Sequence, residues 1–217
     1  MERAKEATSP NRINREALSS HVSLRGNLMQ FLYVAKQKFG PSSGTEWTKY
    51  VEWSGLTQLT EVVTLDGMLG PVVLDETKDS YWPHIVNEDW MLDFFVDLDF
   101  LLSELADTNK LNMLSVIRKP SADVRSVDWG GFTFLGYDLL DQEVAISALT
   151  NCGGFPDVFA NSELSHVGLI PDFDRAAEIQ DMLRRMHPEE RHADCDIWAI
   201  SRWQGDDRLP HPPIASG

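Results

Sequence analysis

Apolar residues recur along this chain with two different spacings, and together these spacings predict its secondary structure. Short runs rich in apolar and β-branched side chains are typical of strands. Such runs lie at residues 30–36, 61–65, 111–117, 132–140, 144–149 and 197–203. A helical spacing of apolar residues predicts a helix over residues 173–186, with Asp172 as its N-cap and Pro188 just beyond its end. Residues 45–53, after the Gly- and Pro-rich break at 40–44, predict a short helix or an irregular aromatic segment.

Residues 87–105 fit two patterns at once. Trp90, Phe94, Leu98 and Leu101 follow helical spacing, whereas apolar and acidic residues alternate over residues 94–101 as they would in a strand. The helix is the favoured prediction. The turns are predicted more clearly. Asp66-Gly67 is a turn signal at the end of the predicted strand 61–65, and residues 72–74 would pair with that strand as a hairpin. Residues 129–131 predict another turn.

The order of these elements predicts the fold class. Strands arrive in groups, with helices between the groups and not after each strand, which favours an α+β fold with a mostly antiparallel sheet and two or three helices. The 217 residues are expected to form a single domain over residues 29–203. Residues 1–28 lack hydrophobic periodicity and predict a flexible leader, so translation starting at Met29 is an open alternative; residues 204–217 predict a flexible tail.

Charge narrows the class of partner. The chain has 34 acidic and 19 basic side chains, a net charge of −15, while residues 1–28 alone are slightly basic. A field of this sign repels nucleic acid and anionic membranes and attracts basic proteins. The alternative is that the charge only keeps the protein soluble. Two cysteines form no disulfide framework, and no secretion signal or long apolar run is present, so the predicted location is cytoplasmic.

The negative charge is densest between Asp75 and Asp107, where the sequence has ten acidic residues and one basic residue, Lys78. Aromatic residues are interleaved with these carboxylates, so the segment is expected to fold and to hold its charge on a fixed surface. Exposed aromatic side chains ringed by charge are typical of protein-binding sites. The alternative is that every tryptophan belongs to the core. The predicted binding residues for a basic protein partner are Asp79, Trp82, Glu88, Asp89, Trp90, Asp93 and Asp97.

One short stretch suggests covalent chemistry. Cys152 precedes two glycines after a predicted strand, so its thiol could be open to approach, with His166 or His192 as the base. The alternative is a structural thiol within a turn. Cys152 and Cys195 with His187 and His192 match no usual zinc spacing, and Asp97 and Asp99 would chelate a cation only if they lay on a strand. No metal or cofactor is therefore expected.

Two functional hypotheses follow. The favoured one is an acidic cytoplasmic protein-binding module, for example an inhibitor or immunity-type protein that neutralises a basic toxin or nuclease. The alternative is a small cysteine-dependent enzyme that uses Cys152 with a histidine base. The common phosphate-binding, dinucleotide-binding, serine hydrolase and zinc protease motifs are absent from the sequence, which favours the non-enzymatic hypothesis.

Overall fold

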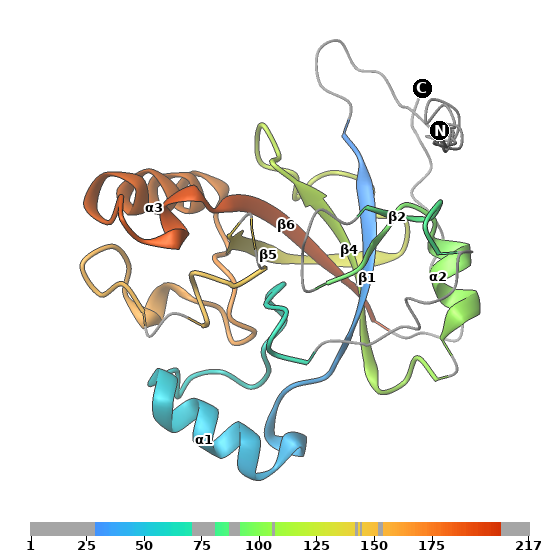
Figure 1. Ribbon diagram of the computed structural model, residues 1–217, viewed down its shortest axis with the longest axis horizontal. Helices are drawn as coiled ribbons and strands as arrows, with labels where there is room; N and C mark the ends of the chain where they lie inside the picture. Colours follow the sequence, from blue (N-terminus) through green and yellow to red (C-terminus); the bar gives the residue numbers. More distant parts are fainter. Residues whose placement is uncertain are drawn as a thin grey trace, which may run out of the picture.

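Six strands within the described part of the chain pair into one antiparallel sheet with the order β2-β3-β1-β4-β6-β5 (Figure 1). The computed structural model describes residues 29–70, 81–86, 92–105, 107–141, 143, 145–151 and 154–204. The strands are β1 (Phe31–Gln37), β2 (Ile85–Val86), β3 (Phe94–Phe95), β4 (Leu111–Arg118), β5 (Phe132–Leu140) and β6 (Asp196–Trp203). The predicted single-domain α+β fold with a mostly antiparallel sheet is confirmed.

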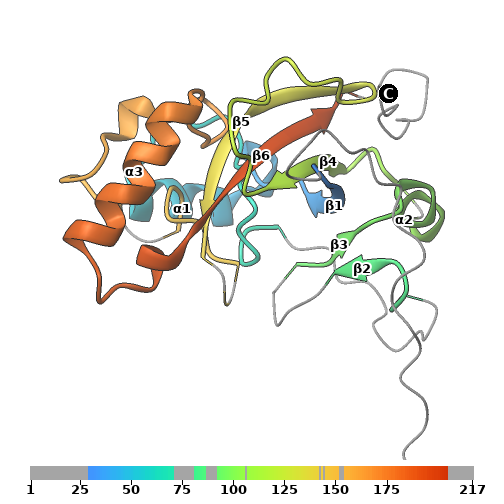
Figure 2. The ribbon, with the colours of Figure 1, turned by 90° about the horizontal axis from the view of Figure 1, so that it is seen from above.

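The described part of the chain also forms three α-helices: α1 (Thr45–Ser54), α2 (Leu98–Glu104) and α3 (Phe173–Met186). Short 3-10 turns form at η1 (Pro41–Ser43), η2 (Asn161–Glu163) and η3 (Arg191–Asp194). The bounds predicted for α3 are confirmed, and the Asp172 side chain accepts a hydrogen bond from the Arg175 amide as its cap. Viewed from above, α1 and α3 lie toward one end of the sheet and α2 lies toward the other (Figure 2).

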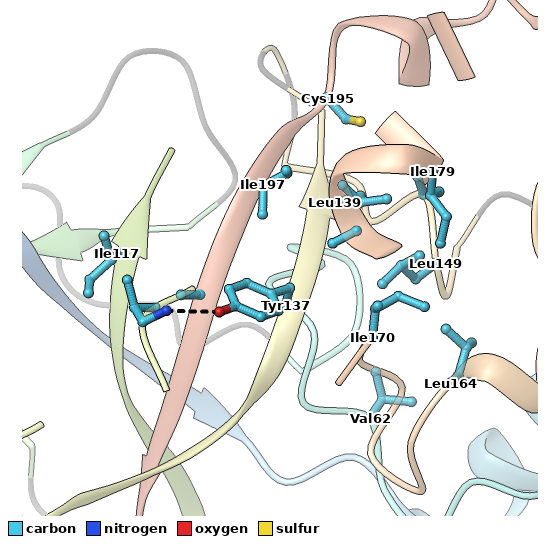
Figure 3. Close-up of a cluster of buried hydrophobic side chains, with 14 of the residues drawn as sticks. Val62, Ile117, Tyr137, Leu139, Leu149, Leu164, Ile170, Ile179, Cys195 and Ile197 are labelled. Atoms are coloured by element: carbon cyan, nitrogen blue, oxygen red, sulfur yellow. Dashed lines mark hydrogen bonds between the residues drawn. The ribbon is translucent and has the colours of Figure 1, made fainter. Parts of the chain in front are cut away.

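Both faces of the sheet are buried, which explains why its strands are almost continuously apolar. One face contributes Tyr33 and Leu139 to a core that includes Tyr50 of α1, Leu101 of α2 and Ile179 of α3. Figure 3 shows Leu139 and Ile179 among the side chains of this core. Each such side chain contributes about 1.5–3 kcal/mol when fully buried.

The opposite face of the sheet is covered by connecting segments in place of helices. Val34 and Trp198 on this face pack in one cluster with Leu65 and Leu169, which lie outside the strands. The phenyl ring of Phe94 stacks on Trp198 with ring centroids 4.8 Å apart. The connections on this face are therefore part of the core, and their polar backbone groups need partners within the fold.

Two predicted strands are wrong because they find no strand to pair with over their length. In residues 61–65 only Val62 forms a β-bridge, to Phe39, and the chain bends at Thr64. Of the predicted residues 144–149 the structure describes 145–149, and within these only Ser147 forms a bridge, to Leu140, before the chain turns. Both segments are buried, so their apolar and β-branched composition reflects burial and not strand pairing.

The two patterns in residues 87–105 each hold for part of the segment. Phe94 and Phe95 form β3, and the helix begins only at Leu98, so the favoured prediction of one helix is wrong at its start. The predicted turns at residues 66–67 and 129–131 are confirmed. The predicted hairpin partner at 72–74, the leader at 1–28 and the tail beyond 204 lie outside the described residues. No helix in the residues that are described is long and apolar enough to cross a membrane.

Candidate functional site

A turn formed by residues 81–84 is held against α2 by three side chains. The His84 ring stacks on Phe100 with centroids 3.8 Å apart and planes 5° apart. The Tyr81 hydroxyl donates to Glu104 Oε2 at 2.8 Å. His84 Nδ1 also lies 3.6 Å from Asp97 Oδ2. These contacts place the turn with the N-cap and the last residue of α2.

Asp97 begins α2 because its side chain replaces a missing helical hydrogen bond. Its Oδ1 accepts the Phe100 amide at 3.0 Å, which is the usual N-cap arrangement. The Asp97 side chain remains 45% exposed, and Asp99 in the first turn is exposed as well. Burial, together with the negative charges of Asp97 and Asp99, raises the pKa of the Tyr33 phenol to about 12. The two carboxylates therefore create a negative potential at this end of the sheet.

Trp82 stands at the tip of the 81–84 turn with 60% of its surface exposed. We define the acidic aromatic surface as Trp82, Asp97, Asp99 and Glu104. The sequence contains no lysine or arginine between Lys78 and Lys110, and His84 lies beside Asp97 on this surface. An exposed indole beside three carboxylates can bind a flat or aliphatic group that carries positive charge.

The structure brings together two of the predicted binding residues, Trp82 and Asp97. Asp93 is half-buried just before β3, four residues from Asp97. The other predicted residues lie outside the described residues, and these are Asp79, Glu88, Asp89 and Trp90. Sequence reasoning left Glu104 and His84 out of the site because their contacts join positions 13–23 residues apart, such as Tyr81 with Glu104, and no local pattern shows such contacts.

The tryptophans divide between core and surface. Trp129 and Trp198 are buried, and Trp53 of α1 is 56% exposed like Trp82. Since α1 and α2 lie at different ends of the molecule in Figures 1 and 2, Trp53 does not belong to the acidic aromatic surface. Trp198 and Trp203 of β6 lie on opposite faces of the sheet, because Trp198 is buried in the core of one face and Trp203 is half-buried against the other.

Of the residues predicted for cysteine chemistry, Cys152 lies outside the described residues. His166 is exposed, and its backbone carbonyl accepts the Thr60 amide at 2.8 Å. His192 is buried against Phe155 with ring centroids 5.6 Å apart, and burial lowers its pKa, so it is neutral at pH 7. Neither ring nitrogen of His192 has a hydrogen-bond partner within the described chain.

Cys195 is a buried free thiol, and burial raises its pKa to about 12. A thiol with so high a pKa forms almost no thiolate at pH 7 and is a poor nucleophile. The cysteine-enzyme hypothesis therefore depends on Cys152 alone and stays a prediction.

The candidate metal ligands named from the sequence have other roles in the described residues. His187 Nε2 lies 2.9 Å from Asp157 Oδ2 and is engaged in that contact. Asp97 and Asp99 begin a helix, so the arrangement in which both would lie on one strand face is wrong. No group of three histidine, cysteine or acidic side chains suited to a metal forms in the part of the chain described.

A buried polar cluster that the sequence did not predict lies on the loop-covered face of the sheet. Lys36 Nζ donates to the carbonyls of Thr64 at 2.6 Å and Asp66 at 2.5 Å. Asp138 accepts hydrogen bonds from the Leu65 amide at 2.7 Å and the Ser147 hydroxyl at 2.6 Å. Burial lowers the pKa of Lys36 to about 8 and raises the pKa of Asp138 to about 6.

This cluster holds the fold together and is not open to a ligand. Asp66 Oδ2 accepts the Ser147 amide at 2.9 Å, and Asp66 Oδ1 accepts the Asn151 side-chain amide at 3.0 Å. Lys36, Asp66, Asp138 and Ser147 are each at most 1% exposed. Their hydrogen bonds tie the connections at residues 64–66 and 147–151 to β1 and β5. The sequence signal that could have indicated this cluster is Lys36, a lysine in the otherwise apolar run of residues 31–36.

Comparisons of this chain with protein-family models, with curated proteins and with solved structures found no match. The fold class alone does not imply a function, because one architecture can carry many activities. The geometry and charge of the surface are therefore the features that can indicate a function for this protein.

Proposed function

We propose that this protein is an acidic binding module that captures a basic protein through the acidic aromatic surface. The observation that carries the proposal is the 60% exposure of Trp82 on a turn packed against carboxylate-bearing α2. Leaving a tryptophan in water forgoes a large gain from burial, and docking of a partner would recover it. The most concrete form is an inhibitor or immunity-type protein that neutralises a basic toxin or nuclease.

The charge of the whole chain supports the same kind of partner. A net charge of −15 steers a cationic protein toward the surface and repels nucleic acid. Steered association can approach about 10⁸ M⁻¹s⁻¹ at low salt and slows as salt screens the field. The buried free thiol of Cys195 fits a reducing compartment, and we place the activity in the cytoplasm.

The test is a capture experiment with three versions of the full chain. The site variant D97N/D99N/E104Q removes three charges, while the new amide oxygens at positions 97 and 104 can still cap α2 and accept from the Tyr81 hydroxyl. The control variant E46Q/E52Q/E189Q removes three charges from exposed positions outside this surface. Basic proteins retained from an extract of the native host by the unmodified chain should be lost from the site variant and kept by the control variant.

A second variant, Trp82→Ala, separates contact from charge. Truncating a central aromatic anchor typically costs at least about 2 kcal/mol of binding, roughly a thirtyfold loss of affinity. Affinity for the captured protein would be measured by calorimetry at two salt concentrations. Equal retention by the site and control variants, or unchanged affinity of the Trp82 variant, would remove this surface as the binding site.

A further inference from the structure

A polar cavity of about 430 Å³ opens where β1 and β6 end and β4 begins. These three strands are neighbours in the sheet (Figure 1). Its walls come from separate stretches of the chain, because the turn at η1, the extended residues 60–61 and the loop before β4 close around the strand ends. The volume lies in the lower part of the range for small-molecule sites, about 300–1,000 Å³.

A fixed triad of polar side chains lines this cavity. Arg202 Nη1 donates to Glu61 Oε2 at 2.6 Å, and Asn112 Nδ2 donates to Glu61 Oε1 at 2.6 Å. Arg202 Nη1 also lies 3.4 Å from Asn112 Oδ1. Asn112 is 1% exposed, and the side chains of Glu61 and Arg202 are 19% and 21% exposed. The guanidinium is therefore held in place before any ligand arrives, which lowers the entropy cost of binding.

Most of the donors of Arg202 are unused. A guanidinium has five N–H donors, and both hydrogen bonds of Arg202 within the triad use Nη1. Nε and Nη2 have no acceptor in the residues that the structure describes. The edge formed by these two nitrogens is the one that binds a carboxylate or phosphate with two parallel hydrogen bonds. Lys38, also on the cavity wall, gives one donor to the Asn109 carbonyl at 2.9 Å and has two more.

The net charge of the cavity wall is positive, whereas the net charge of the whole chain is negative. Among the residues that the structure describes, Lys38 and Arg202 line the cavity with one carboxylate, Glu61, and both oxygens of Glu61 are occupied by the triad. The local balance is one positive charge in a chain whose net charge is −15. One positive charge matches a ligand with one negative charge, and the surrounding field disfavours a dianion such as a phosphate monoester.

The remaining walls suit the rest of such a ligand. Ser42, Thr60 and Thr108 supply hydroxyl groups, while Leu111 and Trp203 supply apolar surface. Hydroxyl groups in the wall can exchange hydrogen bonds with hydroxyl groups of a ligand. We propose that this cavity binds a small polyhydroxylated monocarboxylate, a sugar acid or hydroxy acid, with its carboxylate on Arg202 and Lys38. This binding site is separate from the acidic aromatic surface and does not depend on that proposal.

The experiment titrates the ¹⁵N-labelled full chain with gluconate at constant ionic strength and follows its amide spectrum. Saturable shifts should appear for residues 38–43, 108–112 and 201–204, with a midpoint below about 10 mM. Sorbitol, which keeps the hydroxylated chain and lacks the carboxylate, should cause no such shifts. Inorganic phosphate should bind more weakly than gluconate. No saturation, equal binding of sorbitol, or tighter binding of phosphate would each overturn the proposal.

Three variants test the assigned contacts. R202K keeps the charge and loses the planar fork, so the gluconate midpoint should rise about tenfold or more. K38Q removes the charge of an exposed side chain on the cavity wall, and its midpoint should rise about threefold to tenfold. K110Q makes the same charge change at an exposed lysine outside the cavity wall and should leave the midpoint unchanged. Equal losses in K38Q and K110Q would show non-specific attraction and overturn the site.

Discussion

At the scale of single residues, the most demanding feature is the burial of Lys36 and Asp138 in one polar cluster. An ionised group loses several kcal/mol of hydration when it leaves water. The fold offsets this cost with backbone and hydroxyl partners, since Lys36 donates to two carbonyls and Asp138 accepts from Leu65, Leu139 and Ser147. The offset is incomplete for Asp138, because its pKa remains raised, at about 6.

The raised pKa of Asp138 predicts a specific dependence of stability on pH. Between about pH 4 and pH 6 the folded protein holds a proton on Asp138 that the unfolded chain has released. The free energy of unfolding contributed by Asp138 therefore falls as pH rises through this window and stays lower above it. In Asp138→Asn this contribution is lost. The stability gap between the unmodified protein and the variant should widen by about 1–3 kcal/mol from pH 7 to pH 4.

Urea unfolding of both proteins at several pH values measures this gap. His192, whose pKa burial lowers, contributes a slope of the opposite sign in both proteins and therefore cancels in the comparison. Asp138→Asn should also be less stable by about 1–3 kcal/mol at pH 7, since an amide NH₂ cannot accept the Leu65 amide hydrogen. A gap that stays constant from pH 7 to pH 4 would mean that Asp138 titrates normally.

Local sequence rules predicted some of these residue roles and missed others. Asp172 was predicted as a helix cap because capping involves residues only three positions apart. Asp138 was placed correctly in a strand, but its partner Leu65 lies 73 positions away, and no spacing rule connects them. Glu104 and His84 in the acidic aromatic surface were missed for the same reason.

At the scale of elements, the predictions succeeded where an element carries its own boundaries. α3 has a cap at Asp172, a buried stripe including Ile179 and Leu183, and Pro188 beyond its end, and all of these are local. The segment 87–105 lacks such local signals at the boundary between its strand and its helix. Phe95 pairs with Tyr33 of β1 and with Ile85 of β2, and this tertiary pairing makes residues 94–95 a strand despite their helical spacing. Residues 61–65 and 145–149 are the reverse case, because they have strand-like composition but form only a single β-bridge each.

The start of α2 predicts a difference between two substitutions at one position. Asp97→Ala removes the side-chain acceptor of the Phe100 amide and should lower the free energy of unfolding by about 1 kcal/mol. Asp97→Asn keeps an acceptor and should stay within a few tenths of a kcal/mol of the unmodified protein. Chemical denaturation gives both values, and hydrogen exchange should show faster opening of α2 (Leu98–Glu104) in the alanine variant only. Equal stability of the two variants would show that α2 does not depend on this cap.

At the scale of the whole molecule, the arrangement of charge matters more than its total. Several basic side chains are already used in ion pairs within the fold, including Arg118 with Asp196, Arg175 with Glu163 and Arg202 with Glu61. Acidic residues outnumber basic residues by fifteen, and the acidic aromatic surface places three of them on α2 and its N-cap. The sequence predicted both the excess and the segment that carries most of it. It did not predict that a separate cavity would gather positive charge.

This arrangement predicts how salt affects stability in the absence of any partner. At pH 7, raising NaCl from about 0.02 M to 0.5 M screens repulsion between carboxylates and should raise the melting temperature. A gain of about 1 kcal/mol corresponds to roughly 2–4 °C for a chain of this size. The variant D97N/D99N/E104Q should show a smaller increase than E46Q/E52Q/E189Q, although both remove three charges, because only the first takes all three from one short helix and its N-cap. Differential scanning calorimetry of the unmodified protein and the two variants measures this salt response. Identical salt responses of the two variants would mean that negative charge is spread evenly over the molecule, and the acidic aromatic surface would then have no electrostatic advantage for capturing a basic protein.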